Sequence, residues 1–176
     1  STITLSLLTL LVCAPASNAQ VFTSQSAEHA ARVVQSTGQV SVMKDSQPWA
    51  LSIGDSVQCQ QLIFSGPDGY ALFQVSDGST FEIFPNSRVV FRKNPPNWRD
   101  LLDVFVGRVK VHIQRMGTLP NQNRIMTPTA VISVRGTTFD VIVNEEEETT
   151  LVDVIEGEVA VEHLLLPTGE PKILRD

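Results

Sequence analysis

Residues able to carry out covalent or redox chemistry are scarce in this sequence. Its 176 residues include two cysteines, Cys13 and Cys59, and three histidines, His29, His112 and His163. No two histidines stand at a metal-ligand spacing and no cysteine joins them. The chain also has neither a Gly-x-Ser-x-Gly elbow nor a phosphate-binding loop. We therefore predict a protein that is not an enzyme, with no catalytic residue, no cofactor and no metal site.

Basic residues are also few. Thirteen Lys and Arg stand against 19 Asp and Glu, which gives a formal net charge of −6. An acidic domain has no electrostatic attraction for nucleic acid or for an anionic lipid surface. We therefore expect neither as a partner.

Charged residues are absent from the first nineteen positions. A short apolar run, Ile3 to Val12, precedes Ser17-Asn18-Ala19, which offers small residues at the positions that a signal peptidase reads. We predict a signal peptide at residues 1–19 that is cut before Gln20, followed by a flexible arm at 20–32. A lipoprotein signal at Cys13 is the alternative. Because the run is too short to span a bilayer, we expect an exported protein, periplasmic or extracellular, whose mature chain does not insert into the membrane.

The chain begins with Ser rather than Met and lacks the basic residues that open a signal peptide. We therefore expect that a few leading residues precede this sequence. After the leader, Cys59 has no internal disulfide partner, and we interpret it as a small residue of the core.

Short runs with a period of two fill the rest of the chain. Arg108, Lys110 and His112 alternate with Val109 and Val111, as a half-buried strand requires. Further strand-like runs are 57–64, 70–75, 80–84, 130–134, 139–143, 151–156 and 158–163. We predict an all-β domain over residues 33–176, a β-sandwich or flattened β-roll of about a dozen short strands.

Turns and a weak repeat organise these runs. Asp68-Gly69 and Asp77-Gly78 are hairpin signals, and the four glutamates of 145–148 predict a solvated hairpin tip. The form Gly-x-Val-x-Val recurs at Gly38, Gly107 and Gly157, at unequal spacings. The repeat indicates one structural device that is used three times, with a glycine where the chain turns or bulges.

Residues 125–141 carry the most specific motif. They read IMTPTAVISVRGTTFDV, which resembles the T-P-x-A-x-x-x-V-R-G-T-x-F-x-V pattern of FecR domains. The resemblance extends over about residues 33–163 and includes Ile53-Gly54-Asp55 and Gly157-Glu158-Val159. Its motif residues are Pro128, Ala130, Val134, Arg135, Gly136, Thr137 and Phe139.

The resemblance implies a stand-alone exported FecR domain protein that is similar to the periplasmic domain of the ferric-citrate regulator type. In such regulators this β domain follows a cytoplasmic anti-sigma segment and one membrane span, and it receives a signal from an outer-membrane receptor. The resemblance also implies a domain that binds partners rather than substrates. We expect an envelope protein as the partner.

Arg135 allows two interpretations. Its guanidinium could pair with a carboxylate such as Asp140 or Glu156 and so stabilise the fold. Alternatively, it anchors a ligand. For Gly136 we expect a bulge or a close backbone approach.

Large amphipathic aromatic residues are few. Trp98 follows a proline-rich loop and precedes Arg99, and we propose Trp98, Arg99 and Tyr70 as a candidate binding surface. Trp49 we place in the core. The sequence thus favours a protein-interaction or signal-sensing module of the bacterial cell envelope. The alternative is a cell-wall or polysaccharide-binding module, which needs an exposed aromatic platform.

Overall fold

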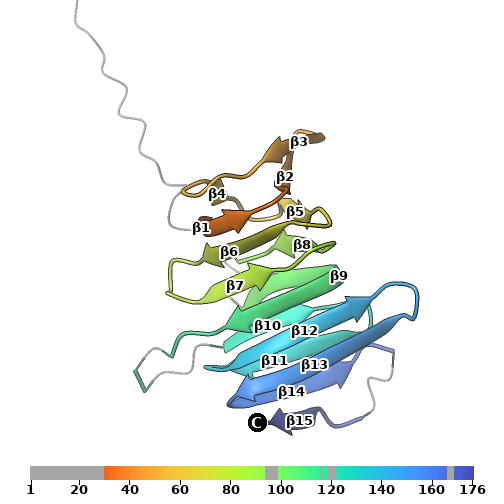
Figure 1. The fold of residues 1–176 in the computed structure, drawn as a ribbon. Helices are drawn as coiled ribbons and strands as arrows, with labels where there is room; N and C mark the ends of the chain where they lie inside the picture. The colour runs from red at the N-terminus through yellow and green to blue at the C-terminus, as the bar shows by residue number, and fades with distance from the viewer. Residues whose placement is uncertain (1–29, 94–98, 116, 119–121, 166–168) are drawn as a thin grey trace, which may run out of the picture.

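The described structure is built of stacked strands joined by turns and short loops (Figure 1). The computed structural model describes residues 30–93, 99–115, 117–118, 122–165 and 169–176, which contain fifteen strands and no helix. This confirms the all-β prediction. The predicted leader at 1–19 and most of the arm at 20–32 lie outside the described residues. Within them, no helix is long and apolar enough to cross a bilayer.

The N-terminal half holds eight of the strands. They are β1 (Ala31–Thr37), β2 (Val40–Lys44), β3 (Gln47–Ala50), β4 (Ser56–Val57), β5 (Leu62–Ser65), β6 (Tyr70–Gln74), β7 (Thr80–Ile83) and β8 (Arg88–Phe91). The remaining strands are β9 (Asp100–His112), β10 (Gln122–Met126), β11 (Ala130–Arg135), β12 (Thr138–Asn144), β13 (Thr149–Glu156), β14 (Glu158–His163) and β15 (Lys172–Arg175).

These strands form two packed sheets that share β9. Sheet A has the order β4-β1-β6-β7-β9-β12-β13. Sheet B has the order β3-β2-β5-β8-β9-β10-β11-β14-β15. The first half of β9 pairs with β8 and β10, and its second half pairs with β7 and β12. The arrangement is the predicted β-sandwich, with more strands than the dozen expected.

The core lies between the two sheets. The alternation along β9 is as predicted, because Val109 and Val111 are fully buried while Arg108 and His112 are exposed. Three buried rings form a stack: Phe81 lies 4.8 Å from Phe73 and 6.1 Å from Phe91 between ring centroids. Since Phe91 belongs to sheet B and the other two to sheet A, this stack joins the sheets. Each such side chain contributes roughly 1.5–3 kcal/mol by burial.

The Gly-x-Val-x-Val glycines occupy the places where the chain passes from one sheet to the other. Gly38 lies between β1 and β2, Gly107 lies at the change of sheet within β9, and Gly157 lies between β13 and β14. All three have positive φ, of 63°, 95° and 96°. A side chain at Gly107 would also meet the backbone of Ser87, with a Cβ 2.6 Å from its Cα. The repeat is therefore a sheet-crossing corner, which confirms one device used three times.

Of three turn predictions, two are confirmed and one is wrong. Asp77-Gly78 closes the β6–β7 hairpin as predicted, and the Glu145–Glu148 segment is exposed at the tip of the β12–β13 hairpin. Asp68-Gly69, however, is not a hairpin turn. It joins β5 of sheet B to β6 of sheet A, so its two strands do not pair.

Three further predictions are corrected by the structure. The run 57–64 is not one strand, because a turn at residues 58–61 separates β4 from β5. Cys59 lies in that turn, where it is half-buried, its thiol donates to the Arg92 carbonyl at 3.3 Å, and burial raises its pKa. Trp49 is not a core residue but 58% exposed, because β3 is an edge strand with every residue exposed.

Candidate functional site

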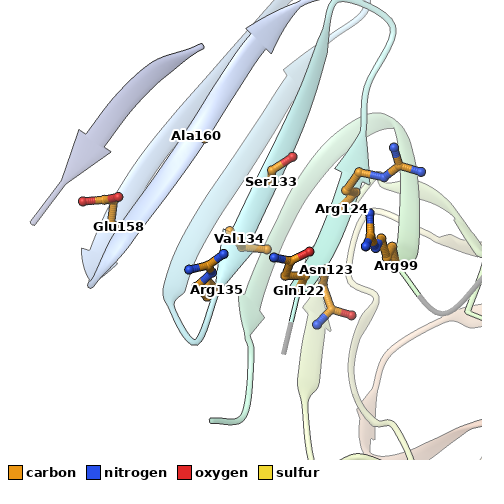
Figure 2. A pocket seen from close by; sticks show the side chains of 9 residues that line it. All are labelled: Arg99, Gln122, Asn123, Arg124, Ser133, Val134, Arg135, Glu158 and Ala160. Atoms are coloured by element: carbon orange, nitrogen blue, oxygen red, sulfur yellow. The ribbon is translucent and has the colours of Figure 1, made fainter. Parts of the chain in front are cut away.

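A groove on the outer face of sheet B is the best candidate for a binding site (Figure 2). It has a volume of about 620 Å³ and crosses β10, β11 and β14, with Arg99 at one end just before β9. We call it the arginine groove. Its lining residues are Arg99, Gln122, Asn123, Arg124, Ser133, Val134, Arg135, Glu158 and Ala160.

The strand register explains why this face is hollow. Arg124 of β10 stands opposite Ser133 of β11, which in turn stands opposite Ala160 of β14. Two short side chains thus follow one long one across the sheet. Gln122 stands opposite Arg135 in the neighbouring row. Long polar side chains therefore surround a floor of small residues.

Charge in the arginine groove is of the opposite sign to that of the whole protein. Arg124 donates to Asp100 Oδ1 at 2.7 Å, and Glu158 accepts from Arg175 at 2.7 Å. These contacts pair Arg124 and neutralise the Glu158 carboxylate, the one carboxylate of the groove lining. Among the described residues, the guanidinium groups of Arg99 and Arg135 have no hydrogen-bond or ion-pair partner. The groove can therefore accept an anionic group at two arginines.

The predicted ion pairs of Arg135 do not form. Asp140 accepts instead from Arg108 Nη2 at 2.7 Å, and Arg108 also lies 4.4 Å from the Phe84 ring centroid. The reason is the corner at Gly136, because β11 belongs to sheet B and β12 to sheet A. Arg135 and Asp140 therefore lie on opposite outer faces of the sandwich.

The remaining motif residues build that corner. Ala130, Val134 and Phe139 are buried, with 6%, 3% and 0% of their surface exposed. Gly136 has φ +64°, and the buried Thr137 hydroxyl donates to the Glu158 carbonyl at 2.9 Å. This last bond ties the β11–β12 corner to β14. The motif thus fixes the strands beside the arginine groove and presents Arg135 on it.

Pro128, the remaining motif position, is exposed in the turn between β10 and β11. The turn is held by Thr127, whose hydroxyl oxygen accepts from the Ala130 amide at 2.9 Å.

Of the predicted binding surface, the structure describes Arg99 and Tyr70, and it does not bring these two together. Arg99 lines the arginine groove, and Trp98 lies outside the described residues. Tyr70 is not part of the groove lining. It lies on β6 of sheet A, where its hydroxyl donates to Glu82 Oε2 at 2.8 Å. Burial, this hydrogen bond and the charge of Glu82 raise the pKa of Tyr70 to about 12.

Three groove residues, Gln122, Asn123 and Arg124, come from a strand that the sequence pattern does not reveal. Residues 117–123 read as a loop, and β10 begins at Gln122 within it. Burial alternates along this strand, with Arg124 and Met126 half-exposed and Asn123 and Ile125 buried, but the sequence does not alternate, because Asn123 is polar and Met126 is apolar. In the described part of the chain, no group of three His, Cys, Asp or Glu residues could hold a metal ion.

The fold and the groove define an all-β domain of two packed sheets that carries a cationic surface groove. Residues 61–160, more than half of the chain, match the model of the FecR protein family, and the chain belongs to that family. This confirms the resemblance carried by the 125–141 motif. No curated protein matches the chain.

Two solved structures share the fold. They are crystal structures of a candidate anti-sigma factor from Parabacteroides distasonis, with TM-scores of 0.54 and 0.53 and sequence identities of 17% and 18%. Each similarity covers 65% of this chain and 50% of the solved chain. This chain therefore spans about half the length of the structures it matches.

Proposed function

We propose that this chain is a non-catalytic FecR-like module of the bacterial cell envelope, which binds a protein partner through the arginine groove as part of a signalling system. Membership of the FecR family supports a regulatory role. The description of the similar structures as a candidate anti-sigma factor points the same way. The uncharged leader at 1–19 supports export to the periplasm or beyond the cell.

One observation carries the proposal: Arg99 and Arg135 line the same groove and neither is paired with a described residue. A guanidinium forms two parallel hydrogen bonds with a carboxylate, and such charge-assisted pairs are about twice as strong as neutral ones. Arginine is also enriched among the residues that dominate binding energies at interfaces. A partner with acidic side chains therefore fits the groove.

A polysaccharide is the weaker candidate for the partner. A glycan-binding face needs clustered, exposed aromatic side chains. Trp49 on β3 and Phe105 on β9 are exposed, but three strands of sheet B separate them, and the ring of Tyr70 packs edge-on against Phe84 at 5.6 Å. The polar and charged lining of the arginine groove favours a protein with carboxylate side chains.

Affinity capture from envelope extract tests the proposal. The mature chain, residues 20–176, should retain one specific protein, and Arg99→Ala/Arg135→Ala should lose it. The matched control is Arg32→Ala/Arg88→Ala, which removes the same charge from two exposed arginines outside the groove. This control should retain the protein.

Three results would contradict the proposal. Equal capture by both double variants would show that the groove does not take part in the interaction. Equal loss in both would show that overall charge matters rather than the site. Recovery of polysaccharide by the parent chain would favour the glycan module.

A further inference from the structure

The two sheets end unequally at the C-terminal end of the sandwich. Beyond the shared strand β9, sheet B continues through β10, β11, β14 and β15, whereas sheet A continues only through β12 and β13. Figure 1 shows β15 at the far end of the stack, below β13 and β14. In the described structure, no strand of sheet A lies beyond β13 to face β15.

The core is incompletely covered at this end. Four hydrophobic side chains that pack against the core are only partly buried: Val152, Val154, Val161 and Leu174. All four lie on β13, β14 and β15. At the other end of the sandwich, on β1 and its neighbour β4, Val33 and Val57 are 1% and 0% exposed. The uncovered part of the core is therefore confined to the last three strands.

The edge of sheet A at this end is also long, and its one pairing irregularity, at Ile155, lies near the end of the strand. Among the described residues, β13 pairs with β12 and with no second strand. Its eight residues contain no proline or glycine, and Leu151 and Ile155 are 60% and 47% exposed. The opposite edges are blunted, because β4 has two residues and β3 contains Pro48. A long edge strand without proline, whose bulge is confined to one end, is a template for an added strand.

We propose that the free edge of β13 accepts an extended, basic segment of a partner protein as an added strand, which completes sheet A over Leu174. Backbone hydrogen bonds to β13 would supply the pairing, and alternate apolar side chains of the segment would cover Leu174 and Val152. This inference rests on the proposed role in partner binding but uses a different surface from the arginine groove.

On the outer face of sheet A, the charge beside β13 selects an occupant whose outward side chains are basic, whereas Lys172 on β15 shares the inner side with Leu174 and favours apolar side chains there. Asp153 and Glu156 are exposed on the strand, and the hairpin at its start carries the exposed Glu145–Glu148 run. Lysine or arginine on the outer face of the added strand would lie beside these carboxylates. A second copy of this chain is disfavoured, because two acidic edges and two net charges of −6 would meet.

A synthetic probe tests strand addition directly. The probe is a peptide of alternating lysine and valine that matches β13 in length; the control peptide replaces its central valine with proline. Hydrogen exchange of the mature protein is measured with each. With the probe, the amides of β13 should exchange at least about tenfold more slowly, while the exchange rates of the β3 and β4 amides should not change. The proline peptide should give no protection.

Two variants separate this inference from the proposed function. Asp153→Lys, an exposed change on the free strand, should weaken probe binding by about fivefold, because it removes one surface ion pair and sets a like charge beside the probe. Arg99→Ala/Arg135→Ala should bind the probe as the parent does. Loss of envelope-protein capture in the groove variant with retained probe binding thus reports on each surface independently.

Several outcomes would overturn strand addition. Probe binding without protection of β13 would show adsorption to the acidic surface. Equal protection by the proline peptide would exclude a paired strand. A dimer of the parent protein that protects β13 in the absence of probe would assign the edge to a second copy.

Discussion

Replacement of Gly107 by alanine should be among the most damaging small changes to this fold. Gly107 has φ +95°, and an added Cβ would lie 2.6 Å from Ser87 Cα and 2.7 Å from Ser87 Cβ. Ser87 cannot move aside easily. It is fully buried, its amide donates to Ser65 Oγ at 2.9 Å, and its Oγ accepts from the Arg108 amide at 3.0 Å. The clash therefore involves the backbone of a fixed residue.

The chain offers a control with the same backbone strain. Gly54 also has φ +95°, but an added Cβ would meet only Arg32 Nη2, at 3.9 Å. An L-residue at positive φ costs roughly 1–2 kcal/mol, which applies to both positions. Overpacking costs a further 1–3 kcal/mol or so, which applies to Gly107→Ala only. We therefore expect free energies of unfolding lower by about 1–2 kcal/mol for Gly54→Ala and about 2–5 kcal/mol for Gly107→Ala.

Equilibrium denaturation with urea, followed by tryptophan fluorescence, measures both variants. Because β9 belongs to both sheets, the transition should stay a single step with an unchanged slope. Equal losses in the two variants would refute the corner as a tightly packed contact. A two-step transition for Gly107→Ala would refute the idea that β9 couples the sheets.

Three other predictions concern stability. Phe81→Ala should lower the free energy of unfolding by about 3–5 kcal/mol, because the ring of Phe81 is fully buried between Phe73 and Phe91. In the same denaturation assay, Trp49→Ala on the exposed edge should lower it by about 0.5 kcal/mol or less. Lys93 is buried and pairs with Asp77 and with Asn123 Oδ1 at 3.1 Å, so Asp77→Ala should lower the free energy of unfolding by about 3–5 kcal/mol. The double variant Lys93→Met/Asp77→Ala should recover part of this loss. No recovery would argue against an uncompensated charge as the cause. Tyr70 is the one tyrosine of the chain, so ultraviolet absorbance should show tyrosinate forming near pH 12 rather than 10. Its raised pKa means that the associated stability is present below pH 10 and is lost between pH 10 and about 12, a loss that Tyr70→Phe should abolish.

The sequence was most informative where local chemistry decides the structure. Alternation along 108–112 predicted which side chains of β9 are buried, because side chains of a strand point alternately to its two faces. The Gly-x-Val-x-Val glycines predicted places where the chain turns or bulges, because positive φ is accessible to glycine at low cost.

Long-range pairing was beyond what sequence patterns can indicate. Asp68-Gly69 and Asp77-Gly78 look alike, yet one crosses between sheets and the other closes a hairpin, since the choice depends on which strands are adjacent in space. Trp49 was placed in the core on hydrophobicity, but its exposure follows from the edge position of β3. The arginine groove could not be predicted, because its floor depends on the register that aligns Ser133 with Ala160.

Site-specific photo-crosslinking in the producing cell tests the central claim most directly. A photoreactive residue at Ser133, exposed on the floor of the arginine groove, is compared with one at Gln74, exposed on β6 of sheet A. The account predicts a protein adduct at position 133 that disappears in the Arg99→Ala/Arg135→Ala background, and none at position 74. An adduct that forms equally at both positions, or that survives the loss of both arginines, would contradict it.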